Sequence, residues 1–147
     1  MVPAAFDIRG WRMAALAFDS AGEPHVVYTS GPEAAPDETV TADIMYVHRL
    51  GSTGWTEPEK IGELEVEYGQ DESLVELDFD NQGRLHAAYS GYGAGYTITH
   101  LFRQDGVWSS PTEVVTGASA VDMAVDPDGR VRRMWPGVTN SNGITWS

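Results

Sequence analysis

The chain has 147 residues, 41% of them hydrophobic, a formal net charge of −13 and no cysteine. Nine basic residues against 22 acids argue against binding to a nucleic-acid backbone, which requires clustered lysine and arginine. Without cysteine there is no disulfide or thiolate metal site, which is compatible with either redox compartment. No apolar run approaches about 18 residues, so we expect no membrane span, and the first residues do not resemble a signal peptide.

The predicted elements are short strands separated by turn residues. Residues 2–8 form the first candidate strand, and residues 14–18 form the second. An Asp-x-x-Gly turn from Asp19 to Gly22 then leads into a strand that ends at Tyr28. Further strands are predicted over residues 44–49 and 55–61, the latter opening with Trp-x-x-Pro. This pattern favours an antiparallel meander of four strands.

The same pattern of strands around an Asp-x-x-Gly turn recurs twice more along the chain. The second copy has strands over residues 75–79 and 96–103, with the turn from Asp80 to Gly83 between its first two strands, and its Trp-x-x-Pro strand spans 108–114. The third copy starts with the strand 121–125 and the turn at Asp126, and it stops after a third strand over 143–147. We expect residues 2–8 to supply its missing fourth strand, because edge pairing satisfies open backbone groups.

Four-stranded units with Asp-x-x-Gly after the first strand and Trp-x-x-Pro at the fourth resemble β-propeller blades, closest to the sialidase-like group with Asp-box-related repeats. The resemblance implies an all-β fold in one domain, 1–147, with blades at about 12–64, 65–117 and 118–147 plus 1–8. Propellers usually have about four to eight blades. We therefore expect two chains to form a six-bladed homodimeric ring. The alternatives are a fragment of a longer propeller and an engineered or remnant piece.

The repeated turn residues first suggest metal binding. Calcium takes about six to eight oxygen ligands, whereas each turn offers one or two carboxylates. We therefore predict that each turn aspartate accepts hydrogen bonds from its own turn, with glycine at positive φ. His25 and His86 share one repeat position, where the third copy has Arg132. We interpret this position as one that packs and satisfies the turn, and we assign no catalytic residue, metal ligand or cofactor.

The first strands alternate between two kinds of side chain. One predicted packing face carries Ala14, Leu16 and Phe18 in the first copy, Val75, Leu77 and Phe79 in the second, and Val121, Met123 and Val125 in the third. The opposite face carries Glu76, Asp78 and Asp122. By the propeller resemblance the first strand is innermost, so these three carboxylates are predicted to line a central channel. Buried carboxylates need water, protonation or a cation; we expect a water-filled channel, and a channel-bound cation is the alternative.

A ligand site is sought in the loops that join second to third and fourth to first strands. The candidate ligand-binding residues there are Trp11, Arg12, Tyr68, Asp71, Tyr92 and Asn142. Aromatic faces beside Asp, Arg and Asn suit a glycan. We therefore expect a non-enzymatic binding or scaffold module that self-assembles and takes a carbohydrate. The alternative is a piece of a glycan-degrading enzyme, either a sialidase-like hydrolase or a polysaccharide lyase.

Overall fold

The computed structural model describes residues 14–32, 35–67, 75–91, 97–116, 122–126, 130–136 and 144–146. Within these ranges every regular element is a β-strand and every strand pair is antiparallel. The prediction of an all-β chain is therefore confirmed. The described residues also contain no helix of the length and apolarity that a membrane crossing requires.

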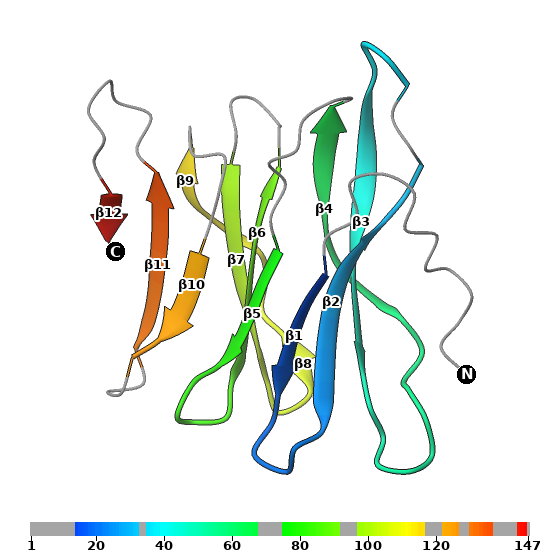
Figure 1. The fold of residues 1–147 in the computed structure, drawn as a ribbon, viewed down its shortest axis with the longest axis vertical. Helices are drawn as coiled ribbons and strands as arrows, with labels where there is room; N and C mark the ends of the chain where they lie inside the picture. The colour runs from blue at the N-terminus through cyan, green and yellow to red at the C-terminus, as the bar shows by residue number, and fades with distance from the viewer. Residues whose placement is uncertain are drawn as a thin grey trace.

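The strands form three consecutive sheets (Figure 1). The first is a meander of β1 (Ala14–Phe18), β2 (Pro24–Ser30), β3 (Thr39–His48) and β4 (Glu59–Glu67). The second has β5 (Val75–Phe79), β6 (Leu85–Gly91) and β7 (Thr97–Gln104), with β8 (Val107–Trp108) and β9 (Thr112–Thr116) both pairing with β7. The third has β10 (Asp122–Val125), β11 (Val131–Pro136) and β12 (Ile144–Trp146). Its predicted fourth strand, residues 2–8, lies outside the described residues.

The tryptophans predicted to open the fourth strands belong to the preceding hairpins. Trp55 forms an isolated bridge with Arg49, and Trp108 pairs with Arg103. Each tryptophan therefore closes the tip of a third strand. The fourth strands β4 and β9 begin only after the proline that follows each tryptophan, because a proline has no N–H to donate to the ladder.

The repeat extends to an irregularity in strand pairing. The ladder between β3 and β4 shifts register after Ile44, and the ladder between β7 and β9 shifts after Ile98. Ile44 lies opposite Thr29, and Ile98 lies opposite Ser90. Thr29 and Ser90 each directly follow the tyrosine that ends the repeated sequence. Bulges bend and twist a strand locally, and the two register shifts fall at equivalent points of the first two sheets.

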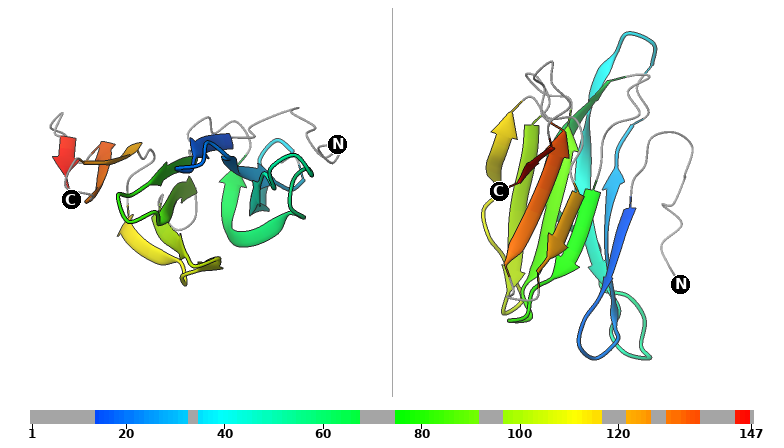
Figure 2. Two further views of the ribbon diagram at one scale, coloured as in Figure 1. Left: turned by 90° about the horizontal axis from the view of Figure 1, so that it is seen from below. Right: turned by 60° about the vertical axis from the view of Figure 1, so that its left-hand side comes forward.

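The main core lies between the first and second sheets. Val27 and Tyr46 of the first sheet are fully buried in one cluster with Leu85 and Leu101 of the second. A smaller cluster, which includes Ile98 and Met123, joins the second sheet to the third. The first strands of the three sheets lie side by side, with β1 beside β5 and β5 beside β10 (Figures 1 and 2).

The predicted packing face of the first strands is buried in two sheets and exposed in the other. Val75, Leu77 and Met123 are buried as expected. In β1, however, Leu16 and Phe18 are 55% and 59% exposed. The prediction that this face is packed is therefore wrong for β1 in the single chain. The physical reason is that this face of β1 points away from the second sheet, and the described residues include no sheet on that side.

Candidate ligand-binding cleft

The turn aspartates are held by their own turns. Asp19 Oδ1 accepts hydrogen bonds from the backbone N–H groups of Ala21 and Glu23, at 2.9 and 2.8 Å. The carboxylate of Asp80 makes the equivalent pair with Gln82 and Arg84, each at 2.9 Å. Gly22 and Gly83 have φ angles of 79° and 77°, a region that glycine adopts without strain. The predicted role of these turn residues is therefore confirmed in the first two repeats.

The side chain at the shared position of the second strand reaches the turn aspartate in every repeat. His86 Nε2 lies 3.1 Å from Asp80 Oδ2, and Arg132 Nε donates to Asp126 Oδ2 at 2.8 Å. In the first repeat His25 Nε2 is 3.7 Å from the Asp19 carboxylate. The interpretation of this position as one that satisfies the turn is confirmed by hydrogen bonds in the second and third repeats, whereas His25 in the first repeat lies only within ion-pair distance.

Asp80 is the most enclosed of these carboxylates, at 5% exposure. Burial opposes its ionisation, but hydrogen bonds from Arg84, His86 and the turn together hold its pKa well below the usual range. Arg84 Nε donates to Asp80 Oδ2 at 2.6 Å. The negative charge at this turn is therefore compensated within the turn itself.

His25 also contacts a buried tyrosine. Its Nδ1 lies 2.7 Å from the hydroxyl of Tyr46. Tyr46 is 1% exposed, and burial raises its pKa to about 12. A tyrosine that removes a proton from a substrate needs access to that substrate and a lowered pKa. Tyr46 has neither, so the His25–Tyr46 pair is suited to a structural role, holding β2 and β3 together.

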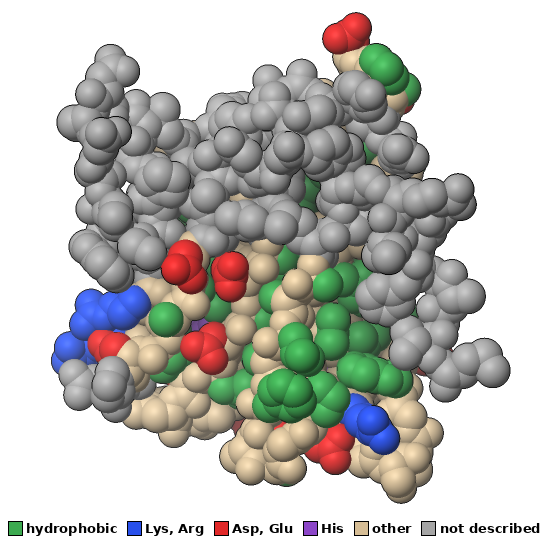
Figure 3. Space-filling view, in the orientation of Figure 1, with side chains coloured by type: hydrophobic (Ala, Val, Ile, Leu, Met, Phe, Trp, Pro, Cys, Tyr) green, Lys and Arg blue, Asp and Glu red, His purple; other side chains and the backbone are tan. Residues whose placement is uncertain are grey.

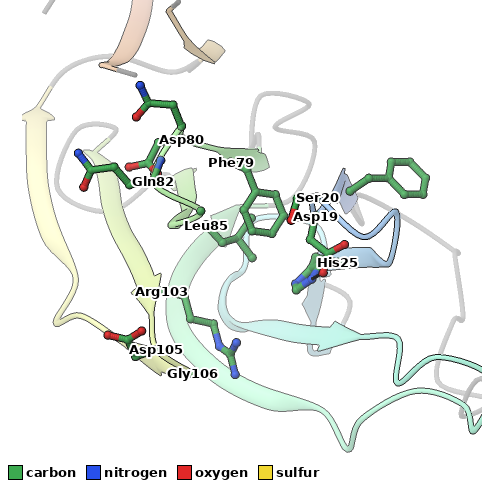
Figure 4. Close-up of a pocket in the computed structure, with 13 residues that line it drawn as sticks. Asp19, Ser20, His25, Phe79, Asp80, Gln82, Leu85, Arg103, Asp105 and Gly106 are labelled. Atoms are coloured by element: carbon green, nitrogen blue, oxygen red, sulfur yellow. Dashed lines mark hydrogen bonds and ion pairs between the residues drawn. The ribbon is translucent and has the colours of Figure 1, made fainter. Parts of the chain in front are cut away.

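A cleft of about 760 Å³ opens between the turns of the first and second sheets. Figure 4 shows Phe79 in the middle, with Asp19 and His25 on one side and Asp80 and Gln82 on the other. Arg103, at the end of β7, and Asp105, in the turn to β8, complete the wall. The cleft thus combines residues of both Asp-x-x-Gly turns with one hairpin tip.

Among the described residues that line this cleft, Arg103 is the one lysine or arginine. Its Cζ lies 5.1 Å from the centre of the Tyr46 ring. Its Nε is buried and finds no hydrogen-bond partner in the part of the chain that the structure describes. Because Arg103 lines the cleft, its guanidinium charge would stabilise an anionic oxygen bound there.

Both ring faces and hydrogen-bonding groups are available to a ligand in the cleft. The Phe79 ring is half-buried and packs edge-on to His25, with 5.0 Å between the ring centres. Asp105 is exposed in the turn beside Gly106, and Gln82 contributes an amide. An apolar surface bordered by a few polar groups and a charge is typical of small-molecule sites.

The predicted ligand-binding residues Trp11, Arg12, Tyr68, Asp71, Tyr92 and Asn142 all lie outside the described residues. The cleft is at the other end of the strands from the loops that were expected to bind a ligand, because it is formed by the first-to-second strand turns. One sequence signal points to it. Both turns follow a phenylalanine directly, as Phe18-Asp19 and Phe79-Asp80, so neighbouring turns place aromatic and acidic side chains together.

The three predicted channel carboxylates lie where the second and third sheets meet. Glu76 and Asp78 are on β5, and Asp122 is on the neighbouring β10. Burial raises the pKa of Glu76, and the negative charge of Asp122 acts in the same direction. Asp78 Oδ2 accepts a hydrogen bond from the backbone N–H of Val125 at 3.1 Å. Asp78 therefore links the two sheets, and the channel itself stays a prediction.

Within the described part of the chain no three His, Asp or Glu side chains gather in a way that could hold a metal ion. Neither a scan against protein-family models nor a search of curated proteins finds a match to the chain.

Proposed function

We propose that the chain is a non-enzymatic binding module of β-propeller type, which self-associates and binds carbohydrate. The propeller assignment is supported by three consecutive antiparallel sheets whose first strands lie side by side, since blades around an axis have that arrangement. The recurrence of the turn hydrogen bonds and of the register shift in the first two sheets supports it further. Six sheets from two chains would make a ring of ordinary propeller size.

The observation that carries the binding role is the cleft between the two turns. It offers the ring of Phe79 to an apolar sugar face, and acidic and amide groups to sugar hydroxyls. Arg103 adds a guanidinium cation to the lining of the cleft. The ligand class that fits best is an oligosaccharide with an acidic group, whose carboxylate pairs with the Arg103 guanidinium.

The test is a glycan array followed by calorimetry on the sugars that bind. We expect acidic oligosaccharides to bind, and Arg103→Gln to weaken binding at least about tenfold, the loss of one charge-assisted hydrogen bond. Arg49→Gln is the matched control, because Arg49 is exposed directly after β3 and is not among the residues that line the cleft. Equal binding by the wild type and Arg103→Gln would contradict the site. Turnover of a bound polysaccharide would contradict the non-enzymatic assignment.

A further inference from the structure

The sheets stack in one repeated order of faces. We define face A of a sheet as the face that carries Leu16, Leu77 or Met123 of its first strand, and face B as the opposite face. Face B of the first sheet, with Ala17 and Val27, packs on face A of the second sheet, with Leu77. Face B of the second sheet, with Ala88, packs on face A of the third sheet, with Met123. The contact is therefore B on A both times.

This order leaves face A of the first sheet without a covering sheet. Leu16 and Leu77 occupy the same repeat position, yet Leu16 is 55% exposed and Leu77 only 7%. Phe18 is likewise exposed, whereas its counterpart Phe79 is partly buried in the core. Figure 3 shows hydrophobic side chains gathered over β1 and its neighbour β2. Exposed apolar patches of this kind mark interaction surfaces.

The complementary surface is uncovered at the other end of the chain. Ala124 of β10 has the repeat position of Ala17, which is buried against the second sheet, but Ala124 is exposed. Arg132, on the same face B of the third sheet, keeps 44% of its side-chain surface exposed while it pairs with Asp126. A small alanine on face B leaves room for large side chains of face A, as Ala17 does against the second sheet.

We propose that face A of the first sheet is covered by face B of the third sheet of a second copy of this chain. This inference rests on the self-association proposed above and names the surfaces that meet. Two copies related by a two-fold axis form the contact twice, and the six sheets close with no face left over. A contact of face A with face A would form only once and would leave Ala124 exposed in both copies.

The test begins with the mass of the wild type by light scattering after size exclusion. We expect a mass near twice the 16.0 kDa of the chain. Leu16→Glu should raise the dissociation constant of the dimer at least about a hundredfold, because it replaces a large apolar side chain of the contact with a charge whose burial is costly. Leu50→Glu and Val107→Glu are matched controls, since both residues are large, apolar and exposed in turn or hairpin positions away from face A. They should leave the mass unchanged.

A mixing experiment tests the pairing of A with B. Ala124→Arg should also give a monomer, while an equimolar mixture of Leu16→Glu and Ala124→Arg should recover the dimer mass. In the mixed pair one contact is wild type, and the other brings the two substituted side chains, which carry opposite charges, against each other. Circular dichroism and melting of each single variant confirm that it is folded.

The possible failures can be told apart. A wild-type chain that is monomeric would overturn both self-association and this inference. A wild-type dimer that persists in Leu16→Glu would overturn the inference and leave self-association standing. A dimer broken by Leu16→Glu but unaffected by Ala124→Arg would overturn the A-on-B contact in favour of A on A.

Discussion

Tyr46 and His100 take the same place in two successive repeats, and each contacts the histidine of the adjoining second strand. The Tyr46 hydroxyl is 2.7 Å from His25 Nδ1, and His100 Nε2 is 3.0 Å from His86 Nδ1. On its other side each histidine faces the turn aspartate through Nε2. Since the carboxylate favours a proton on Nε2, Nδ1 is left to accept from Tyr46 or His100. Each network thus links a turn to the third strand.

The two networks should differ in their contribution to stability. Asp80→Asn should lower the free energy of unfolding by about 2–4 kcal/mol, because it leaves Arg84 and His86 without their buried anion. Asp19→Asn should cost about 1 kcal/mol or less, since Asp19 is more exposed and its histidine is farther away, at 3.7 Å. Urea denaturation of the two variants measures the difference. Equal losses would show that the buried network adds nothing to the turn.

The first network predicts a pH dependence. Burial lowers the pKa of His25, with His48 and Arg103 acting in the same direction against Asp19. Burial, followed by Arg103, lowers the pKa of His48 as well. Because both folded-state pKa values lie below the unfolded value of about 6.5, the unfolded chain takes up more protons as the pH falls. The contribution of the two neutral histidines to the free energy of unfolding is therefore complete above about pH 6.5 and declines below it.

The measurement is the melting temperature at pH 7.5 and 5.5 for the wild type and His25→Gln/His48→Gln. Acidification also reduces the repulsion within a chain of net charge −13, so the comparison is between the two proteins. We expect the wild type to lose more stability, or gain less, than the double variant on going to pH 5.5. The same change in both proteins would rule out the histidines as the source.

Local chemistry explains which features were predictable from sequence. The strand–turn–strand phrase around Asp19 and Asp80 requires only residues a few positions apart, and its hydrogen bonds and glycine φ angles were predicted. The face of β5 that carries Leu77 was also predicted, because alternation of apolar and polar side chains indicates a half-buried strand.

Features that depend on neighbouring sheets were not predictable. Leu16 has the same local pattern as Leu77, but its exposure depends on whether another sheet lies above it. The contact between His86 and His100 depends on the register of β6 and β7, which no local pattern around either histidine specifies. The Arg103 cleft requires a third strand of one sheet to meet the turn of another, so no single segment carries its signature.

Glu76 is expected to weaken the fold at neutral pH. Burial and the nearby Asp122 raise its pKa, so the fold favours its neutral form and loses stability as the pH rises through the unfolded-state value of about 4.5. Glu76→Gln should therefore be more stable than the wild type at pH 7, with the difference vanishing near pH 4. Glu57→Gln removes the same charge at an exposed position and serves as the control. A stabilisation equal to that of the control would trace the effect to net charge alone.

Gly62 leaves room for Tyr89 at the contact between the first and second sheets. A Cβ atom at position 62 would overlap the hydroxyl of Tyr89 and lie 3.0 Å from its Cζ. The φ of Gly62 is not positive, so Gly62→Ala tests space rather than backbone strain. Tyr89 is buried in the core, so its ring would have to shift to admit the added methyl group. We expect Gly62→Ala to lower the free energy of unfolding by about 1–3 kcal/mol through overpacking.

A double-mutant cycle with Tyr89→Phe isolates this contact. Tyr89→Phe removes the oxygen that the new methyl group would meet, so Gly62→Ala should be less destabilising in that background than in the wild type. Both backgrounds are compared by urea denaturation, with the slope against denaturant checked for a common unfolded state. If Gly62→Ala costs the same in both, the tyrosine hydroxyl is not what excludes a side chain at position 62, and the close approach of β4 to β6 has another cause.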